Sequence, residues 1–168
     1  NSGAIVDISV TIFGIIYIAW FLSFLIKIRY MEGGLGLIVV LLLIAKGGDI
    51  GAYLIGRRFG RTPLLPRISP RKSVEGAVGG LLFSAAAGTV GGMLLKLPMT
   101  LPQLLFIGTS LGILAQLGDL SESLVKRDCQ VKDSGNFFPG MGGILDVVDS
   151  LIFTAPVFYF YPTFNTYR

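Results

Sequence analysis

Histidine is absent from the 168 residues of the sequence, and cysteine occurs once, at Cys129. Without histidine, the chain has no His-ligated zinc site, no Ser-His-Asp triad and no histidine general base. A single cysteine forms no disulfide within the chain. Charged residues are also scarce, at 14% of the sequence against roughly 25% in soluble domains. A chain with so little charge is expected to expose much of its surface to lipid instead of water.

The sequence is instead rich in long apolar segments. Hydrophobic residues make up 52% of it, and the mean hydropathy is +0.73. A helix needs about 20 apolar residues to cross the hydrocarbon core of a bilayer. Five segments reach or approach this length, at residues 5–26, 35–55, 76–95, 101–117 and 144–161. We therefore expect an all-α, polytopic transmembrane helix bundle with about five spanning helices, in which residues 1–168 form one domain.

The basic residues are unevenly shared between the two sides of such a bundle. Six of them, and no acid, lie in the segment 57–72, and three more lie between the fourth and fifth apolar segments. Four lie on the opposite side. Lys and Arg collect in cytoplasmic loops, so we expect an integral membrane protein with two polar loops in the cytoplasm. The net charge of +4 is accounted for in this way, and we expect no nucleic acid as a partner.

The third apolar segment carries glycines at the spacing of a small-residue helix face. Such a face lets neighbouring helices approach closely, and it leaves a homodimer open. The glycines are Gly76, Gly79, Gly80, Gly88, Gly91 and Gly92.

Two charges, Lys46 and Asp49, interrupt the second apolar segment. Each is costly inside a membrane, but their i, i+3 spacing lets them pair on one helix face. One interpretation is a buried ion pair, or snorkelling toward the cytoplasmic end. The other places Asp49 at the mouth of a polar cavity that faces the two basic loops.

Two further pairs of acids have the same i, i+3 spacing: Asp119 with Glu122, and Asp146 with Asp149. Each pair lies on one face of its helix, so four carboxylates converge if the two helices are neighbours. Oxygen ligands without His or Cys favour Mg²⁺, Mn²⁺ or Ca²⁺. We expect a Mg²⁺ site, with Mn²⁺ as a second choice. The alternative is that the acids pair with nearby basic residues.

The residues between these two acid pairs are suited to polyphosphate. Lys126, Arg127 and Lys132 beside a bound metal would neutralise the charge that develops on a leaving pyrophosphate. Gly142 and Gly143, together with Gly140, come just before a helix start, where backbone amides can approach an anion.

At these residues the sequence closely resembles the phosphatidate cytidylyltransferase family, the CDP-diacylglycerol synthases. The family signature has Ser followed by Lys-Arg, then Lys-Asp, a Pro-Gly-His-Gly-Gly turn and two Asp three residues apart. The matching stretches here are 123–127, 132–135, 139–143 and 146–150. Residues 49–53, 56–60 and 68–76 resemble the family's Asp-x-Gly-Ala-Tyr and Ser-Pro-Lys-Lys-Thr-x-Glu-Gly stretches. The resemblance is strongest over residues 47–156 and is to the C-terminal portion of the family.

Two positions depart from the family pattern. Met141 stands where the family usually has His, and Val147 where it usually has Arg. If the family His only packs or orients its neighbours, Met141 can replace it. If that His carries protons, we expect slow turnover or none.

The resemblance implies transfer of a cytidylyl group from CTP to phosphatidic acid, which gives CDP-diacylglycerol and pyrophosphate in phospholipid biosynthesis. The implied active site lies at the cytoplasmic face of the bilayer. Its implied catalytic residues are Asp119, Lys126, Arg127, Lys132, Asp133 and Asp146. The implied substrate-binding residues are Asp49, Ser69, Arg71, Lys72, Glu75, Ser123, Gly142 and Gly143. The implied metal ligands are Asp119, Glu122, Asp146 and Asp149.

Other functions stay open at this point. A CTP-dependent lipid kinase of the polyprenol or phytol type would use the same architecture on a neutral alcohol, and would release CDP instead of pyrophosphate. A transporter would line a path with its intramembrane charges, although the acids here gather near one boundary. A non-catalytic membrane scaffold is the remaining alternative.

Overall fold

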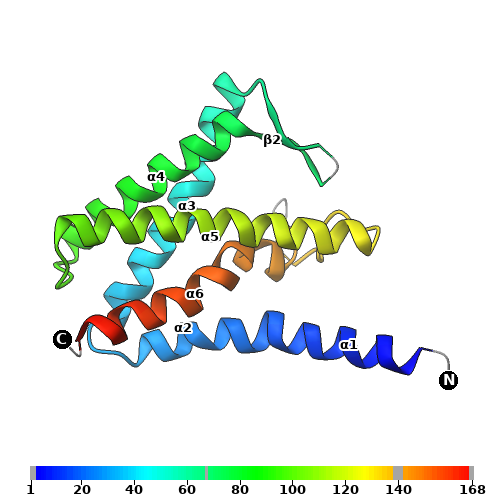
Figure 1. Cartoon of the computed structure of the whole chain (residues 1–168), viewed down its shortest axis with the longest axis horizontal. Coiled ribbons are helices and arrows are strands. Elements are labelled where there is room, and N and C mark those ends of the chain that lie inside the picture. Colours follow the sequence, from blue (N-terminus) through cyan, green and yellow to red (C-terminus); the bar gives the residue numbers. More distant parts are fainter. Residues whose placement is uncertain (1–2, 67, 138–141, 167–168) are drawn as a thin grey trace.

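The computed structural model of the chain describes residues 3–66, 68–137 and 142–166 (Figure 1). Arg67, Arg168 and the predicted turn at 139–141 lie outside the described residues. The first long helix comprises α1 (Ala4–Gly14), the π-helical segment η1 (Ile15–Trp20) and α2 (Phe21–Arg29). It is followed by α3 (Gly34–Phe59), the strands β1 (Pro63–Leu65) and β2 (Ser69–Ser73), α4 (Val74–Leu94), α5 (Leu101–Asp128) and α6 (Ile144–Thr166).

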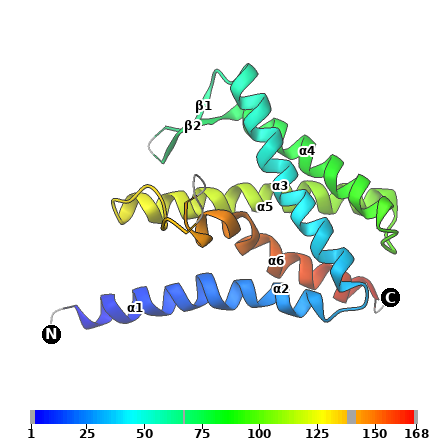
Figure 2. The same cartoon turned by 180° about the vertical axis from the view of Figure 1, so that it is seen from behind.

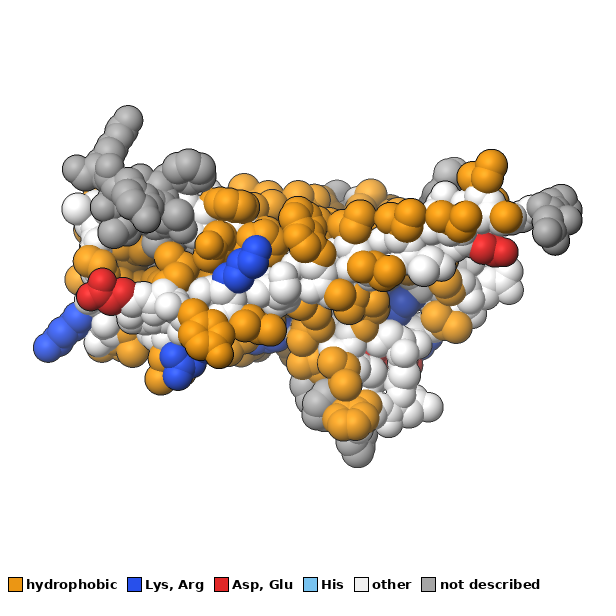
Figure 3. Space-filling model, turned by 90° about the horizontal axis from the view of Figure 1, so that it is seen from below, with side chains coloured by type: hydrophobic (Ala, Val, Ile, Leu, Met, Phe, Trp, Pro, Cys, Tyr) orange, Lys and Arg blue, Asp and Glu red, His pale blue; other side chains and the backbone are white. Residues whose placement is uncertain are grey.

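The described part of the chain contains five helices that are long and apolar enough to cross a membrane. This confirms the predicted transmembrane bundle. Figure 3 shows hydrophobic side chains spread over the face that carries the first helix, with few charged groups among them. Ile5 and Val10, for example, are exposed on α1. A surface of this kind is stable against lipid chains and not against water.

The helices pack in a chain of neighbours. Helix α3 packs along α4, α4 along α5, α5 along α6, and α6 against α2. Figures 1 and 2 show α5 in the middle of this arrangement, with α4 and α6 on different sides of it. A buried apolar core joins α2, α3, α5 and α6, and its largest members include Ile28, Leu41, Leu111 and Phe158.

Glycine makes the close packing of α4 possible, as predicted. All six glycines of the predicted face are buried. A Cβ atom on Gly88 would lie 2.9 Å from the Cα of Gly108, and one on Gly108 would lie 2.8 Å from the Cα of Ala85. The glycine face is therefore used within the chain, against α3 and α5, and it does not by itself favour a homodimer.

Helix α5 is longer than the predicted segment 101–117. It begins at a capping box in which the backbone amide of Thr100 donates to Gln103 Oε1 at 2.8 Å, with Pro102 in the first turn. It continues to Asp128 because Glu122 and Lys126 pair at i, i+4. The apolar run ends where the charged residues begin, so hydropathy underestimates the length of the helix. Several residues that the sequence analysis placed in a loop therefore lie on α5.

A β-hairpin occupies most of the first polar loop, which the sequence analysis left without structure. Strands β1 and β2 are antiparallel, with Pro63 opposite Ser73 and Leu65 opposite Ser69. The Glu75 carboxylate accepts hydrogen bonds from the backbone amides of Arg61 (3.1 Å) and Thr62 (3.2 Å). These bonds fix the base of the hairpin to the first turn of α4.

The glycine contact between α4 and α5 is testable by adding a single methyl group. We expect Gly108→Ala to destabilise the protein by about 1–3 kcal/mol, because the new Cβ overlaps backbone that cannot move aside. Thermal unfolding of the detergent-solubilised protein measures the effect. Gly14→Ala is the matched control, since nothing lies within 4 Å of a Cβ at that position. An unchanged melting temperature for Gly108→Ala would contradict the packing.

Candidate active site

A cavity of about 340 Å³ lies between α3, the hairpin, the start of α4 and the middle of α5. It is within the size range of small-molecule sites, which start at about 300 Å³. Five of the predicted site residues line it: Asp49, Ser69, Arg71, Lys72 and Asp119. They come from segments up to 70 positions apart, so the fold gathers residues that the resemblance assigned separately.

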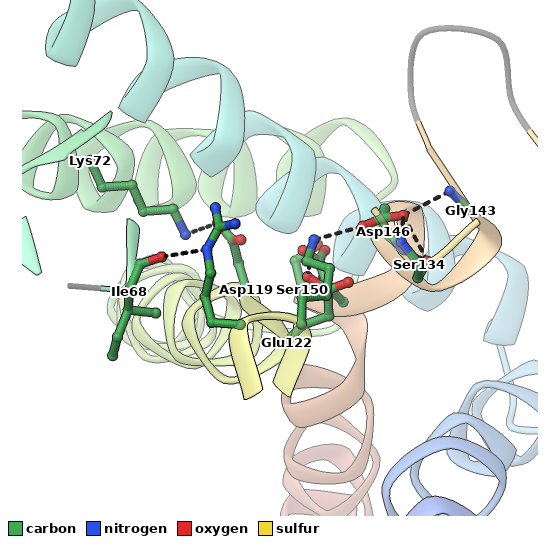
Figure 4. Close-up of polar contacts among 11 residues, drawn as sticks. Ile68, Lys72, Asp119, Glu122, Ser134, Gly143, Asp146 and Ser150 are labelled. Carbon is green, nitrogen blue, oxygen red and sulfur yellow. Dashed lines mark hydrogen bonds and ion pairs between the residues drawn. The ribbon is translucent and has the colours of Figure 1, made fainter. Parts of the chain in front are cut away.

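An ion pair between Lys72 and Asp119 joins the hairpin to α5 at the cavity wall (Figure 4). Nearby, the Nε–H of Arg127 donates to the carbonyl oxygen of Ile68 at 3.4 Å. Both contacts connect the hairpin to the same helix. The strand residue Lys72 is therefore held over α5 and close to the cavity.

Lys46 and Asp49 form the ion pair that their spacing predicted. The ammonium lies 3.1 Å from Asp49 Oδ2, and it also donates to the hydroxyl of Ser150 at 3.2 Å. The two side chains are 40% and 42% exposed, so the pair forms but is not buried, and Asp49 also lines the cavity. The contact with Ser150 further connects α3 to α6.

A second polar cluster, which we call the Lys126 cluster, consists of Glu122, Lys126, Ser134, Gly143 and Asp146. The Lys126 ammonium lies 2.5 Å from Glu122 Oε2 and 2.6 Å from Asp146 Oδ1 (Figure 4). Glu122 is 1% exposed, so two carboxylates are compensated here by one largely buried cation. The cluster connects the end of α5 to the start of α6.

Asp146 has most of its hydrogen-bonding capacity in use. Its Oδ2 accepts from the amide and hydroxyl of Ser134 at 2.8 and 2.7 Å, and from the amide of Gly143 at 2.7 Å. Gly143 thus donates to the carboxylate of its own helix, where the sequence analysis expected a substrate anion. These bonds fix the return of the chain from the loop into α6.

Asp149 lies on α6 next to α5. Its Oδ1 accepts from the backbone amide of Ser150 at 2.5 Å, and its carboxylate interacts electrostatically with Asp119 and Asp49. A Cβ atom on Gly118 would lie 2.5 Å from the carbonyl oxygen of Asp149. The absence of a side chain at Gly118 therefore allows α5 and α6 to approach each other closely at the level of Asp149.

The four predicted metal ligands do not form one group. Asp119 pairs with Lys72, whereas Glu122 and Asp146 share Lys126. Among the described residues, no three His, Cys, Asp or Glu side chains are arranged to hold a metal. A Mg²⁺ ion that binds substrate phosphates needs only one or two carboxylates. Asp119 and Asp149 fit that need best, because neither is saturated by hydrogen bonds as Asp146 is.

The remaining predicted residues lie outside the cavity wall. Glu75 supports the hairpin, and Ser123 is half-buried on α5, one turn from Asp119. Lys132 and Asp133 are exposed in the loop after α5. Gly142 has φ +88°, which favours glycine at the entry to α6.

The structure also adds residues that sequence reasoning missed. Tyr53 and Gln116 line the cavity, and the Gln116 amide donates to the carbonyl oxygen of Ala77 at 2.9 Å. Gln116 could have been noticed as a polar side chain in an apolar segment. Ser134 and Ser150 gave no such signal, because their partners lie on other helices.

The sequence matches the model of the cytidylyltransferase family over residues 1–164. The chain belongs to this family. It is 42% identical to the phosphatidate cytidylyltransferase of Bacillus subtilis (strain 168), in a match that covers 86% of this chain and 54% of that protein. It is 37% identical to the enzyme of the same name from Synechocystis, over 94% of this chain and 62% of that protein.

A further relative is the uncharacterized protein YnbB of Escherichia coli (strain K12). It is 40% identical, over 94% of this chain and 52% of that protein. The chain thus spans about half the length of the curated relatives it matches.

Removing the central cation of the Lys126 cluster should destabilise the fold. We expect Lys126→Met to lower the free energy of unfolding by about 3 kcal/mol, because two buried carboxylates lose their compensation. Lys132→Met, at an exposed position of the loop that follows α5, should change it by less than about 0.5 kcal/mol. Thermal or denaturant unfolding in detergent compares the two. Equal effects would contradict the role of Lys126 at this contact.

Proposed function

We propose that this protein transfers the cytidylyl group of CTP to phosphatidic acid and releases pyrophosphate, with CDP-diacylglycerol as the lipid product. The observation that carries the proposal is the cavity that Arg71, Lys72 and Asp119 line together. In this cavity, the cationic side chains of Arg71 and Lys72 can bind phosphate groups, and the carboxylate of Asp119 beside them is suited to bind a metal ion. Family membership and the activity for which two relatives are named support the choice of substrates.

The reaction needs positioning and charge neutralisation more than acid–base chemistry. The phosphate of phosphatidic acid is already an anion near neutral pH, so it attacks the α-phosphorus of CTP without a general base. The bond to the β-phosphate oxygen breaks, and pyrophosphate leaves with its negative charge. Arg71 and Lys72 line the cavity and would hold phosphate groups there, and Lys126, two turns along α5 from Asp119, would add positive charge nearby.

We propose that Mg²⁺ assists, with Mn²⁺ as a substitute. When bound, such an ion neutralises phosphate oxygens and draws electrons from the α-phosphorus. Asp119 and Asp149 are the residues that would hold it. Asp146 and Glu122 would keep Lys126 in place beside them. The exposed Lys132 and Asp133 are proposed to close over the bound triphosphate.

We further propose that the cavity faces the cytoplasm, where CTP is available. The excess of basic residues in the hairpin loop that lines the cavity and in the loop after α5 supports this orientation. A homodimer stays a prediction.

The role of Asp119 is testable with purified protein in detergent–lipid micelles that contain phosphatidic acid, Mg²⁺ and CTP labelled at the α-phosphorus. We expect Asp119→Asn to lower the formation of labelled lipid by about 100-fold, as for loss of one preorganised electrostatic group. Asp7→Asn changes an exposed carboxylate on α1 in the same way and should leave the rate unchanged. Equal activity of the two variants would exclude Asp119 from the site.

Removal of divalent cations tests the proposed metal. Chelation with EDTA should abolish labelled lipid, and added Mg²⁺ or Mn²⁺ should restore it. Full turnover in EDTA would contradict a metal-dependent reaction. A chimera that carries this chain in place of the matching segment of the Bacillus subtilis relative provides a second format for the same measurements.

A further inference from the structure

Tyr17 is the one residue between Ala4 and Trp20 that the structure buries. It is 6% exposed, whereas its neighbours Ile16 and Ile18 are 46% and 41% exposed. Within the first half of this long helix, the one buried position is thus occupied by a side chain with a polar end. Packing alone would be served better by another isoleucine.

A π-helical turn sets this position. Residues Ile15–Trp20 form η1, between the α-helical segments α1 and α2. Single π-turns within α-helices are uncommon and gather at functional sites, because the wider turn redirects the side chains. The Tyr17 ring stacks on Phe13 at 5.1 Å and meets Phe153 of α6 edge-on at 6.2 Å. The ring is therefore held from two sides.

Phe153 lies one helical turn beyond Asp149 and two turns beyond Asp146, on the same face of α6. Tyr17 therefore meets α6 on the face that carries both aspartates, and Glu122, Asp149 and Lys126 contribute to the electrostatic environment of its hydroxyl. Figures 1 and 2 both show the first helix running alongside α6. The N-terminal helix, which the sequence analysis treated only as a membrane span, thus contacts α6 one turn beyond Asp149.

Two groups in this region lack hydrogen bonds. Within the described residues, the Tyr17 hydroxyl and both carboxylate oxygens of Glu122 are buried without a hydrogen-bond partner. Glu122 Oε2 is ion-paired with the Lys126 ammonium at 2.5 Å, so this carboxylate has a counter-charge but spare accepting capacity. A buried hydroxyl without a hydrogen-bond partner is costly. Each is the complement of the other, since the hydroxyl donates and the carboxylate only accepts.

We infer that Tyr17 is a positioning residue of the active site, whose hydroxyl donates to Glu122 through one water and so helps to hold Lys126 in place for the substrate phosphates. This rests on the proposed function. Tyr17 does not touch the substrates. It limits the positions of the Glu122 carboxylate, and Glu122 in turn limits where the ammonium group stays.

The test removes only the hydroxyl. We expect Tyr17→Phe to lower kcat for labelled lipid by about 10-fold, because a displaced ammonium stabilises the leaving pyrophosphate less well. KM for CTP should stay within about twofold, since Arg71 and Lys72 remain. Tyr30→Phe removes the hydroxyl of an exposed tyrosine and is the matched control. Wild-type kcat for Tyr17→Phe would overturn the inference.

A double-mutant cycle separates positioning from general packing. If Tyr17 acts through Glu122, adding Tyr17→Phe to Glu122→Gln should change kcat less than twofold. An unchanged 10-fold loss in that background would show that Tyr17 acts by another route. The same cycle measured on thermal unfolding needs no turnover. If the two substitutions are coupled in thermal unfolding but the unaltered protein has no activity, the proposed function is refuted and the Tyr17–Glu122 interaction is retained. If their effects on thermal unfolding are additive, the Tyr17–Glu122 interaction is refuted.

Discussion

The ammonium group of Lys126, held between Glu122 and Asp146, is the contact on which the arrangement of the site depends. It compensates two carboxylates that lie almost wholly out of water, at the point where α5 meets α6. Asp146 transmits this constraint to the preceding loop through Ser134 and Gly143. Breaking such a pair leaves an uncompensated buried charge. The last helix, the loop and the end of α5 are therefore placed together.

Close helix approach makes this polar contact possible inside an otherwise apolar protein. Gly118 allows α5 and α6 to come together where the acids face each other, and Gly108 lets α4 lie against the same helix. Lipid offers helices little hydrophobic reason to associate, so small residues and buried polar contacts provide much of the specificity. The cavity lies where the hairpin covers the junction of α3, α4 and α5.

The number and type of helices could be predicted from hydropathy, and the Lys46–Asp49 pair from its spacing. The extension of α5 to Asp128 could not, because a charged helical turn looks like a loop to a hydropathy measure. The motif residues Asp49, Lys72 and Asp119 were found, but which acid faces which base depends on helix packing. Tyr17 gave no signal at all, since a π-turn has no recognisable sequence pattern and its contacts with α6 lie over 100 positions away.

The fate of the label from CTP tests the proposed reaction most directly. CTP labelled at the α-phosphorus and CTP labelled at the γ-phosphorus are supplied separately, with phosphatidic acid and Mg²⁺, to the purified protein or to the chimera described above. If cytidylyl transfer occurs, the α label enters the chloroform-soluble lipid and the γ label is released as pyrophosphate. Transfer of the γ label to lipid would contradict cytidylyl transfer and identify a kinase. Labelled lipid from neither substrate would contradict an enzymatic role in this reaction.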